Sequence, residues 1–504
     1  MKTHRFKWIC IFAGLAVFLF SCQKKTGSDQ RRMTLQEAAG PAAVLPEANW
    51  RRTVAIFEPQ GLSSVEEALF REFTRDFTSR MSAARSVRVA LWPSRAAFQD
   101  TTPTADATLD CRVRVRDSGT ANWFLSIKKS GGSDAVWEFS PESPFAEVYR
   151  LSRRAAGQAA LALGIDTTVI VKKDVPPLTA SLFGRYLEGR ICLGEKTREK
   201  LGCAVRSFKE VLITDSTLIQ AWQGLADGYL DNYRNRWDVN RVWVQLAQDA
   251  AFRAMRLDST RGDVHFLLAQ VYIQWGDLRT AERETRRALE LDPNLAEAWS
   301  LLGDLAVQSR GQYDLALESY GRSLSLSPAS TEAAAGESLV QMGLGRYADA
   351  SRTLETALRT HPDEARLHSA LALSYHYQHN TKDAHSEIRK GLASEDIRPF
   401  SSAVLAMILA STGNLDGALE EVTLRVEPYA GGNAPLCTSV AAVYSLLKRN
   451  GLAVQWLEKA VSLGYRDFIW LSNDPNFDGM RQDQRFVELM RQIKTEWKKN
   501  LAGG

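Results

Sequence analysis

The most regular feature of the sequence is a repeated pattern of apolar and small residues between Leu178 and Leu463. Apolar residues recur three and four positions apart, which predicts amphipathic helices, and the breaks between them predict antiparallel helical hairpins. We number each hairpin so that a bulky, Trp-type residue occupies position 4. In the third hairpin, positions 7, 8, 11, 15, 20, 27 and 32 are then Leu268, Ala269, Tyr272, Gly276, Ala281, Ala288 and Pro293.

The same register fits about eight hairpins. The fourth contains Trp299, Leu302, Gly303, Ala316, Tyr320 and Pro328, and the second contains Trp222, Leu225, Ala226, Tyr229, Ala247 and Ala254. Positions 8, 20 and 27 are small because the two helices of a hairpin approach each other there, and Pro at position 32 ends the second helix.

These residues resemble the tetratricopeptide repeat (TPR). The resemblance implies that residues 178–464 form an all-α superhelical solenoid in which each hairpin buries its apolar face against the next. It also implies an inner face, the surface formed by the first helices of the hairpins, that binds segments of other proteins. We expect residues 465–504 to close the solenoid as a helical cap. The aspartates of that segment fit helix N-caps better than a calcium loop, because the Gly and Glu of an EF-hand are missing.

Residues 50–170 have a different pattern. Short runs with β-strand character, Thr53–Phe57, Ser86–Trp92, Thr108–Arg116, Trp123–Lys129 and Ala135–Phe139, alternate with helical spacing at Ser63–Ser82 and Pro144–Gly164. Gly-containing turns separate the last three strands, which predicts an antiparallel meander. The expected fold class is therefore α+β: a small α/β sheet domain followed by the solenoid. The block Ala107–Phe139 and the order of these elements resemble the TolB amino-terminal-like domain.

The amino terminus predicts export. Lys2, Arg5 and Lys7 precede an apolar run that ends in Ser21–Cys22 and is too short to span a membrane comfortably. The ending resembles a bacterial lipobox, which implies that residues 1–21 are a signal peptide and that Cys22 carries acyl chains such as palmitate. The alternative is a plain secretory signal in which Cys22 is incidental. Residues 22–49 read as a tether. Gln23 follows the cysteine where some lipoproteins carry an Asp that retains them on the inner membrane, so the lipobox resemblance implies the outer membrane, with the protein facing the periplasm.

Composition excludes several classes of function. The net charge is only +4 and no basic runs occur, so we expect no nucleic-acid partner. No phosphate loop, nucleophile elbow or zinc-protease motif is present, so we expect no catalytic residue, cofactor or small-molecule substrate. Five of the seven histidines lie near the sixth hairpin, but no clear ligand set completes a metal site. Cys192 and Cys203 flank the first turn and are either two buried thiols or a disulfide.

The inner face can be predicted from positions 2, 5, 9, 12 and 13. Hairpins two to four place acceptors there and no Lys or Arg: Gln220, Gln223, Asp227, Asp231, Asp263, Gln270, Gln274, Glu297, Asp304 and Gln308. Hairpins five to seven place more apolar residues there: Leu339, Met342, Leu373, His376, Tyr377, Phe400 and Met407. A partner segment with Lys or Arg followed by apolar residues would match this lining, although an acidic face can also be merely solvated.

The sequence therefore predicts a non-catalytic, lipid-anchored envelope lipoprotein that acts as an interaction scaffold or assembly factor through its repeats. A sensory module of an envelope signalling system is the alternative, because relatives of the TolB-like domain are sometimes joined to effector domains. An unrecognised periplasmic enzyme is the third hypothesis.

Overall fold

The computed structural model describes residues 50–92, 105–116, 119–130, 134–167, 179–234, 238, 240–310, 312–394 and 397–502. The predicted signal peptide, Cys22 and the tether lie outside the described residues. The chain forms two compact units. The sheet unit comprises residues 45–299 and 322–329, and the C-terminal unit comprises residues 300–321 and 330–504.

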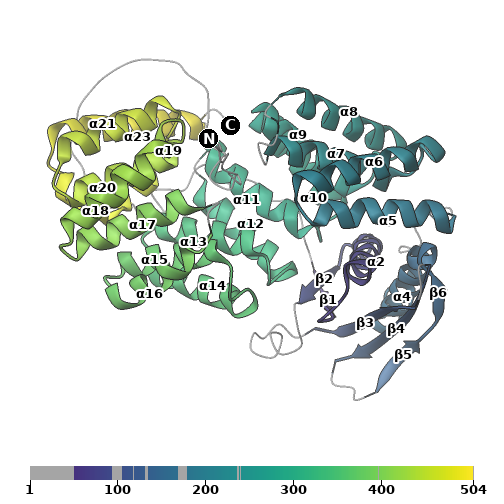
Figure 1. Cartoon of the computed structure of the whole chain (residues 1–504). Coiled ribbons are helices and arrows are strands. Elements are labelled where there is room, and N and C mark those ends of the chain that lie inside the picture. The colour runs from purple at the N-terminus through teal and green to yellow at the C-terminus, as the bar shows by residue number, and fades with distance from the viewer. Residues whose placement is uncertain are drawn as a thin grey trace. The chain divides into compact units, whose positions relative to one another are not determined.

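A single mixed sheet forms the amino-terminal part of the sheet unit (Figure 1). Its strands are β1 (Arg52–Phe57), β2 (Val87–Trp92), β3 (Ala107–Val115), β4 (Thr120–Lys129), β5 (Ala135–Phe139) and β6 (Glu142–Pro144). The order is β2-β1-β3-β4-β5, and β6 also pairs with β4. β1 is parallel to both β2 and β3, whereas β3, β4 and β5 form the predicted antiparallel meander.

Two helices pack on this sheet, α2 (Ser64–Ser82) and α4 (Val148–Leu163), which follows the short 3₁₀-helix η1 (Phe145–Glu147). Alternation along the strands buries Leu109, Cys111 and Val113 of β3 in the main core with α2 and α4. A capping box starts α2, because the Ser63 side chain accepts from the Glu66 amide while Glu66 accepts from the Ser63 amide. All predicted strands and both helices are confirmed. The three-residue β6 was not predicted, because so short a run carries no period.

Helical hairpins follow. The first helices are α5 (Ala180–Gly194), α7 (Ile219–Arg234), α9 (Gly262–Trp275), α11 (Ala296–Arg310), α13 (Thr331–Gly343), α15 (Ala365–Tyr377), α17 (Arg398–Ser411) and α20 (Ala434–Leu446). The second helices are α6 (Arg198–Thr214), α8 (Val242–Leu257), α10 (Leu278–Leu291), α12 (Tyr313–Leu326), α14 (Tyr347–Thr360), α16 (Thr381–Gly391), α18 (Leu415–Glu421) and α21 (Asn450–Ser462). The short π-helix η3 (Val422–Val426) and α19 (Glu427–Ala430) extend the seventh hairpin, and α22 (Phe468–Asn473), η4 (Pro475–Met480) and α23 (Gln484–Ala502) end the chain.

Position 4 has a shared role that confirms the predicted register. The Trp222 and Trp299 indole N–H groups each donate to the carbonyl six residues earlier, at 2.9 and 2.8 Å. His265 and His368 occupy the same position, and their Nε2 atoms lie 3.1 and 2.7 Å from the equivalent carbonyls. In each case a ring nitrogen lies within hydrogen-bond distance of a main-chain carbonyl in the turn before the helix. Trp and His can both occupy position 4 because both rings can provide an N–H donor.

The structure also explains the small residues. Tyr320 at position 24 is buried, and its ring passes Gly303 so closely that a Cβ there would lie 2.8 Å from Cε1. Gly336 of the next hairpin approaches the same ring even more closely, at 2.5 Å. Phe208 passes Gly189 and Gly224 in the same way, at 2.8 and 2.5 Å. Glycine is therefore required where an aromatic residue of the second helix fills the space between two first helices.

Cys192 of α5 and Cys203 of α6 form a disulfide, with their Cα atoms 6.0 Å apart. This settles the choice that spacing left open. The bond ties together the two helices of the first hairpin, and the separation lies within the usual range for disulfides.

Candidate interaction surface

The inner face of the sheet unit consists of α5, α7 and α9, and helices of the chain's own sheet domain lie against it. Helix α2 packs on α5, and Tyr149 of α4 packs edge-on against Phe183 of α5. Asn294, in the turn after the third hairpin, receives a hydrogen bond from Val89 N–H at 3.0 Å and donates to Val87 O at 2.9 Å. The Asn294 amide therefore caps the free edge of β2 as a strand would.

A buried ionic network joins α2 to the first hairpins. Glu72 of α2 is 2% exposed and lies 3.0 Å from Arg75 Nη1 and 3.5 Å from Arg190 Nε of α5. Tyr149 donates to the same carboxylate at 3.1 Å. Burial alone would raise the pKa of Glu72, but Arg75 and Arg190 lower it below its ordinary value. Glu72 is therefore a paired buried charge that fixes α2 on the repeats.

The inner positions of hairpins two to four hold no Lys or Arg, as the sequence predicts, but arginines from other positions lie beside two of their carboxylates. Asp263 makes a two-bond ion pair with Arg261, at 3.0 and 2.6 Å, and accepts a hydrogen bond from Gln223. Burial opposes ionisation of Asp263, yet Arg261 outweighs it and lowers the pKa to about 2. Asp227 lies 3.8 Å from Arg190, and its pKa is raised by burial. The cations come from outside the inner positions of hairpins two to four, so the pattern of those positions could not reveal them.

The other predicted residues of the sheet unit differ in environment. Burial raises the pKa of Asp231 to about 6, and Arg234, which donates to Gln270 at 2.8 Å, opposes that shift. Gln220 is buried, Gln274 is partly exposed and Glu297 is exposed. These side chains share one face but do not converge on a single point.

In the C-terminal unit, the segment Asp467–Met480 lies on the inner face of the repeats. The Asn473 side chain donates to Gly343 O of α13 at 2.8 Å, and Tyr347 of α14 donates to Asn473 O at 3.1 Å. Asn476 Oδ1 lies 2.8 Å from His376 Nε2 of α15, and Ser445 of α20 donates to Asn476 O at 2.7 Å. These four hydrogen bonds connect one segment of 14 residues to hairpins five, six and eight.

Several predicted inner residues contact this segment directly. Tyr377 packs edge-on against Trp470, with ring centroids 6.5 Å apart, and donates a hydrogen bond to Asp474. The Asn476 amide lies 3.6 Å from the Met407 sulfur. Met342 and Leu373 are also buried, whereas Leu339 and Phe400 are partly exposed. The segment predicted as an end cap therefore has two parts with different roles. Helix α23 packs on α21, whereas Asp467–Met480 runs along the inner face.

Burial of carboxylates accompanies this docking. Burial raises the pKa of Asp474 to about 6, although the Asn476 amide and the Tyr377 hydroxyl stabilise its charged form. Burial also raises the pKa of Asp467, which accepts a hydrogen bond from Tyr313 at 2.5 Å. The same desolvation lowers the pKa of His376. The segment is therefore held by hydrogen bonds and aromatic packing rather than by ion pairs.

Asp304 and Glu332 form the acidic part of the C-terminal unit's inner face. Asp304 accepts a hydrogen bond from Tyr320 at 2.6 Å, and burial raises its pKa to about 6, with a further contribution from the negative charge of Glu332. Glu332 is exposed at the start of α13. Among the described side chains, no Lys or Arg forms an ion pair with either carboxylate. The side chain of Gln308 lies outside the described residues.

Within the described residues, no group of three or more His, Cys, Asp or Glu could hold a metal ion. His368 instead pairs with Glu387, and His265 pairs with Glu284, inside their own hairpins. No helix in the described part of the chain is long and apolar enough to cross a membrane.

Comparisons with known proteins identify the repeats. Two tetratricopeptide-repeat family models match residues 266–331 and 308–373. Similar solved structures include PilF of Pseudomonas aeruginosa, at 19% identity over 43% of this chain and 94% of that chain with a TM-score of 0.37. A TPR protein of Parabacteroides merdae is 15% identical over 56% of this chain and 100% of that chain, with a TM-score of 0.35. YrrB, described as a TPR protein with an unusual peptide-binding site, is 19% identical over 39% and 97%, with a TM-score of 0.30. None of the curated proteins matches the chain.

Proposed function

Because the chain contains tetratricopeptide repeats, which generally mediate protein–protein interaction or assembly, we propose that it is a non-catalytic scaffold of the bacterial cell envelope. Cys22 anchors it through acyl chains to the outer membrane, facing the periplasm. Its ligands are proteins or peptides, and it uses no cofactor. The resemblance of the sheet domain to TolB stays a prediction.

The observation that carries this proposal is that the repeats already hold polypeptide on their inner face. The segment Asp467–Met480 meets main-chain and side-chain groups of hairpins four to eight, including His376 and Tyr377 at predicted binding positions. An inner face that holds a non-repeat segment by amide and aromatic contacts has the chemistry of a peptide-binding surface. It also limits where a partner can bind, because this part of the surface is occupied.

The acidic pair Asp304 and Glu332 is the part of the inner face that a positive charge from a partner would stabilise most. Asp304 is desolvated and has no ion-pair partner among the described side chains, and Glu332 is exposed beside it. A Lys or Arg from a partner segment would stabilise both carboxylates and relieve their mutual repulsion. We therefore retain the basic partner segment but place it at the fourth and fifth hairpins, rather than at Asp227 and Asp263, because Arg190 and Arg261 of this chain already lie beside those two carboxylates.

The Cys192–Cys203 disulfide supports the envelope location. Disulfides persist in the periplasm and outside the cell but are rare in the cytosol. The disulfide is independent of the lipobox, since it depends on two residues of the first hairpin.

Charge reversal tests the partner surface. Glu332→Lys should abolish capture of envelope proteins that the full chain retains, because like charge rejects a basic segment. Glu420→Lys in α18 changes the net charge equally at an exposed residue of a second helix and serves as the control. Identical capture by wild type and Glu332→Lys, with the same dependence on salt, would reject the site.

Acylation tests the anchor. A palmitate analogue fed to cells should label the wild-type protein and fail to label Cys22→Ala, because acyl chains added at the lipobox cysteine hold the protein on the membrane. Label that persists in Cys22→Ala would show that the amino terminus is a plain secretory signal.

A further inference from the structure

The segment Asp467–Met480, which we call the strap, covers the part of the inner face that carries His376 and Tyr377. The Asn476 side chain meets His376 Nε2 at 2.8 Å, and Tyr377 donates a hydrogen bond to Asp474. Both side chains are buried, with His376 8% exposed. With the strap docked, these two predicted binding residues are therefore closed to a partner.

Asp474 is the most deeply buried carboxylate of the strap, with 6% of its surface exposed. It accepts hydrogen bonds from the Asn476 main-chain amide at 2.9 Å and from the Tyr377 hydroxyl. The cation that acts on Asp474 is Arg481, whose guanidinium donates to the Asp478 carboxylate at 2.8 Å and to the Asp474 carbonyl at 3.1 Å. Burial therefore raises the pKa of Asp474 to about 6, because its direct donors are neutral.

Asp467 repeats this arrangement at the other end of the strap. Its carboxylate accepts from the Trp470 amide at 2.9 Å and from the Tyr313 hydroxyl of α12 at 2.5 Å. Desolvation raises the pKa of Asp467 although both donors oppose the shift. Tyr465 interacts with both aspartates, and burial together with their charges raises its pKa well above the ordinary value. Tyr465 therefore stays neutral and does not balance either charge.

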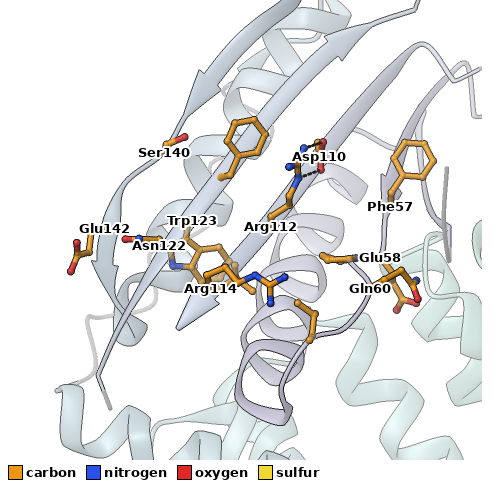
Figure 2. Close-up of a pocket in the computed structure, with 14 residues that line it drawn as sticks. Phe57, Glu58, Gln60, Asp110, Arg112, Arg114, Asn122, Trp123, Ser140 and Glu142 are labelled. Atoms are coloured by element: carbon orange, nitrogen blue, oxygen red, sulfur yellow. Dashed lines mark hydrogen bonds and ion pairs between the residues drawn. The ribbon is translucent and has the colours of Figure 1, made fainter. Parts of the chain in front are cut away.

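Carboxylates of the sheet unit show the contrast. At the cavity of about 930 Å³ beside β3, Arg112 donates to Asp110 through two nitrogen atoms (Figure 2). Burial opposes ionisation of Glu72, yet Arg75 and Arg190 lower its pKa below the ordinary value. These carboxylates are charged beside arginines, whereas the two aspartates of the strap lack that support.

We propose that the strap is a pH-sensitive lid, which closes the inner face around His376 and Tyr377 in acid and opens more often as the pH rises to neutral. A carboxyl group that binds its proton more tightly in the docked strap than in the released strap favours docking at low pH. Docking weakens as the pH rises from the ordinary pKa of Asp474, 3.8, to its raised pKa of about 6. This change of two pKa units corresponds to about a hundredfold in the docking equilibrium, and Asp467 acts in the same direction.

The other titratable groups that face the strap do not reverse this effect. Burial raises the pKa values of Tyr313 and Tyr377 well above the ordinary value, so both remain neutral donors. Burial lowers the pKa of His376, so its protonation opposes docking only in stronger acid. The pH dependence near neutrality therefore comes from the two aspartates.

This inference rests on the peptide-binding role proposed for the inner face and adds its regulation. The measurements below need no partner protein, so a strap that fails to open leaves the proposed site of the basic segment at Glu332 standing. A strap that opens while Glu332→Lys captures the same proteins would reject that site alone.

Hydrogen exchange of the full chain in detergent, read by mass spectrometry from about pH 4 to about pH 7, measures opening of the strap. The Leu471 and Phe477 amides bond to carbonyls within the strap. After correction for intrinsic exchange rates, their protection in the wild type should fall at least about tenfold relative to that of α14.

The double variant Asp467→Asn, Asp474→Asn keeps an acceptor oxygen at both helix starts but cannot ionise. Its strap should stay protected throughout the pH range. Asp416→Asn makes the same change at an exposed aspartate of α18 and should retain the wild-type pH dependence.

Carbethoxylation with diethyl pyrocarbonate measures access to the inner face itself. His379 is exposed and lies three residues from His376, so it is the internal reference. At about pH 7 the labelling of His376 relative to His379 should be at least about tenfold faster in the wild type than in the double variant.

Three results would overturn the proposal: strap protection that does not change with pH in the wild type, protection that is lost only together with that of α14, or equal labelling of His376 in both proteins. If the double variant does not fold, the pH series of the wild type decides alone.

Discussion

Replacement of Gly303 tests the packing rule of the repeats. A Cβ at this position would lie 2.8 Å from Cε1 and Cζ of the Tyr320 ring. The ring cannot retreat, because Gly336 approaches it from the next hairpin and its hydroxyl is bonded to Asp304. Gly303→Leu should therefore destabilise the C-terminal unit by roughly 1 to 3 kcal/mol, the usual cost of overpacking, even though leucine favours the helix by about 0.7 kcal/mol relative to glycine.

Gly321→Leu is the control, because it lies next to Tyr320 on α12 and a Cβ there meets nothing within 4 Å. Its effect should be neutral or stabilising by up to about 1 kcal/mol. Thermal unfolding followed by circular dichroism measures both, with about 2 to 4 °C expected per kcal/mol for a unit of this size. Equal midpoints for Gly303→Leu and wild type would refute the packing argument and the register.

Three further predictions concern the caps, the disulfide and pH. Asn294→Ala should cost about 1 to 3 kcal/mol in urea unfolding, because buried main-chain groups of Val87 and Val89 lose their partner; an unchanged midpoint would contradict this. Replacing Cys192 and Cys203 by Ser should cost roughly 2 to 3 kcal/mol for a loop with a sequence separation of 11, and the loss should vanish when both proteins are reduced. The raised pKa of Asp304, about 6, means that its folded state favours the proton, so stability should fall as pH rises from about 4 to 6. Asp304→Asn should lack that fall, and parallel pH profiles of wild type and variant would contradict the assignment.

The sequence predicted the parts of this fold that depend on local pattern. The register of the hairpins followed from small residues such as Ala269 and Gly303, and the structure gives the reason in the close approach of helices and rings. The strands of the sheet domain were also predicted, because alternation and Gly turns are local signals. The disulfide was left open, since spacing does not determine the distance between Cα atoms.

The inner face could be predicted only as a set of positions. What lies against it depends on contacts between residues far apart in sequence, such as His376 with Asn476 and Arg190 with Glu72. Arg190 is in the first hairpin, which the charge count of hairpins two to four did not include. The cluster of Asn, Asp and aromatic residues at 467–480 was a signal of an unusual segment, but nothing local shows that it lies along the inner face.

Site-specific photocrosslinking in intact cells tests the central claim that the inner face of the repeats binds a partner protein. A photoreactive residue at position 332, exposed at the start of α13, should form an adduct with an envelope protein, and the same residue at Thr356, exposed on the second helix α14, should form none. Adducts from position 356 alone, or from neither position, would contradict the account.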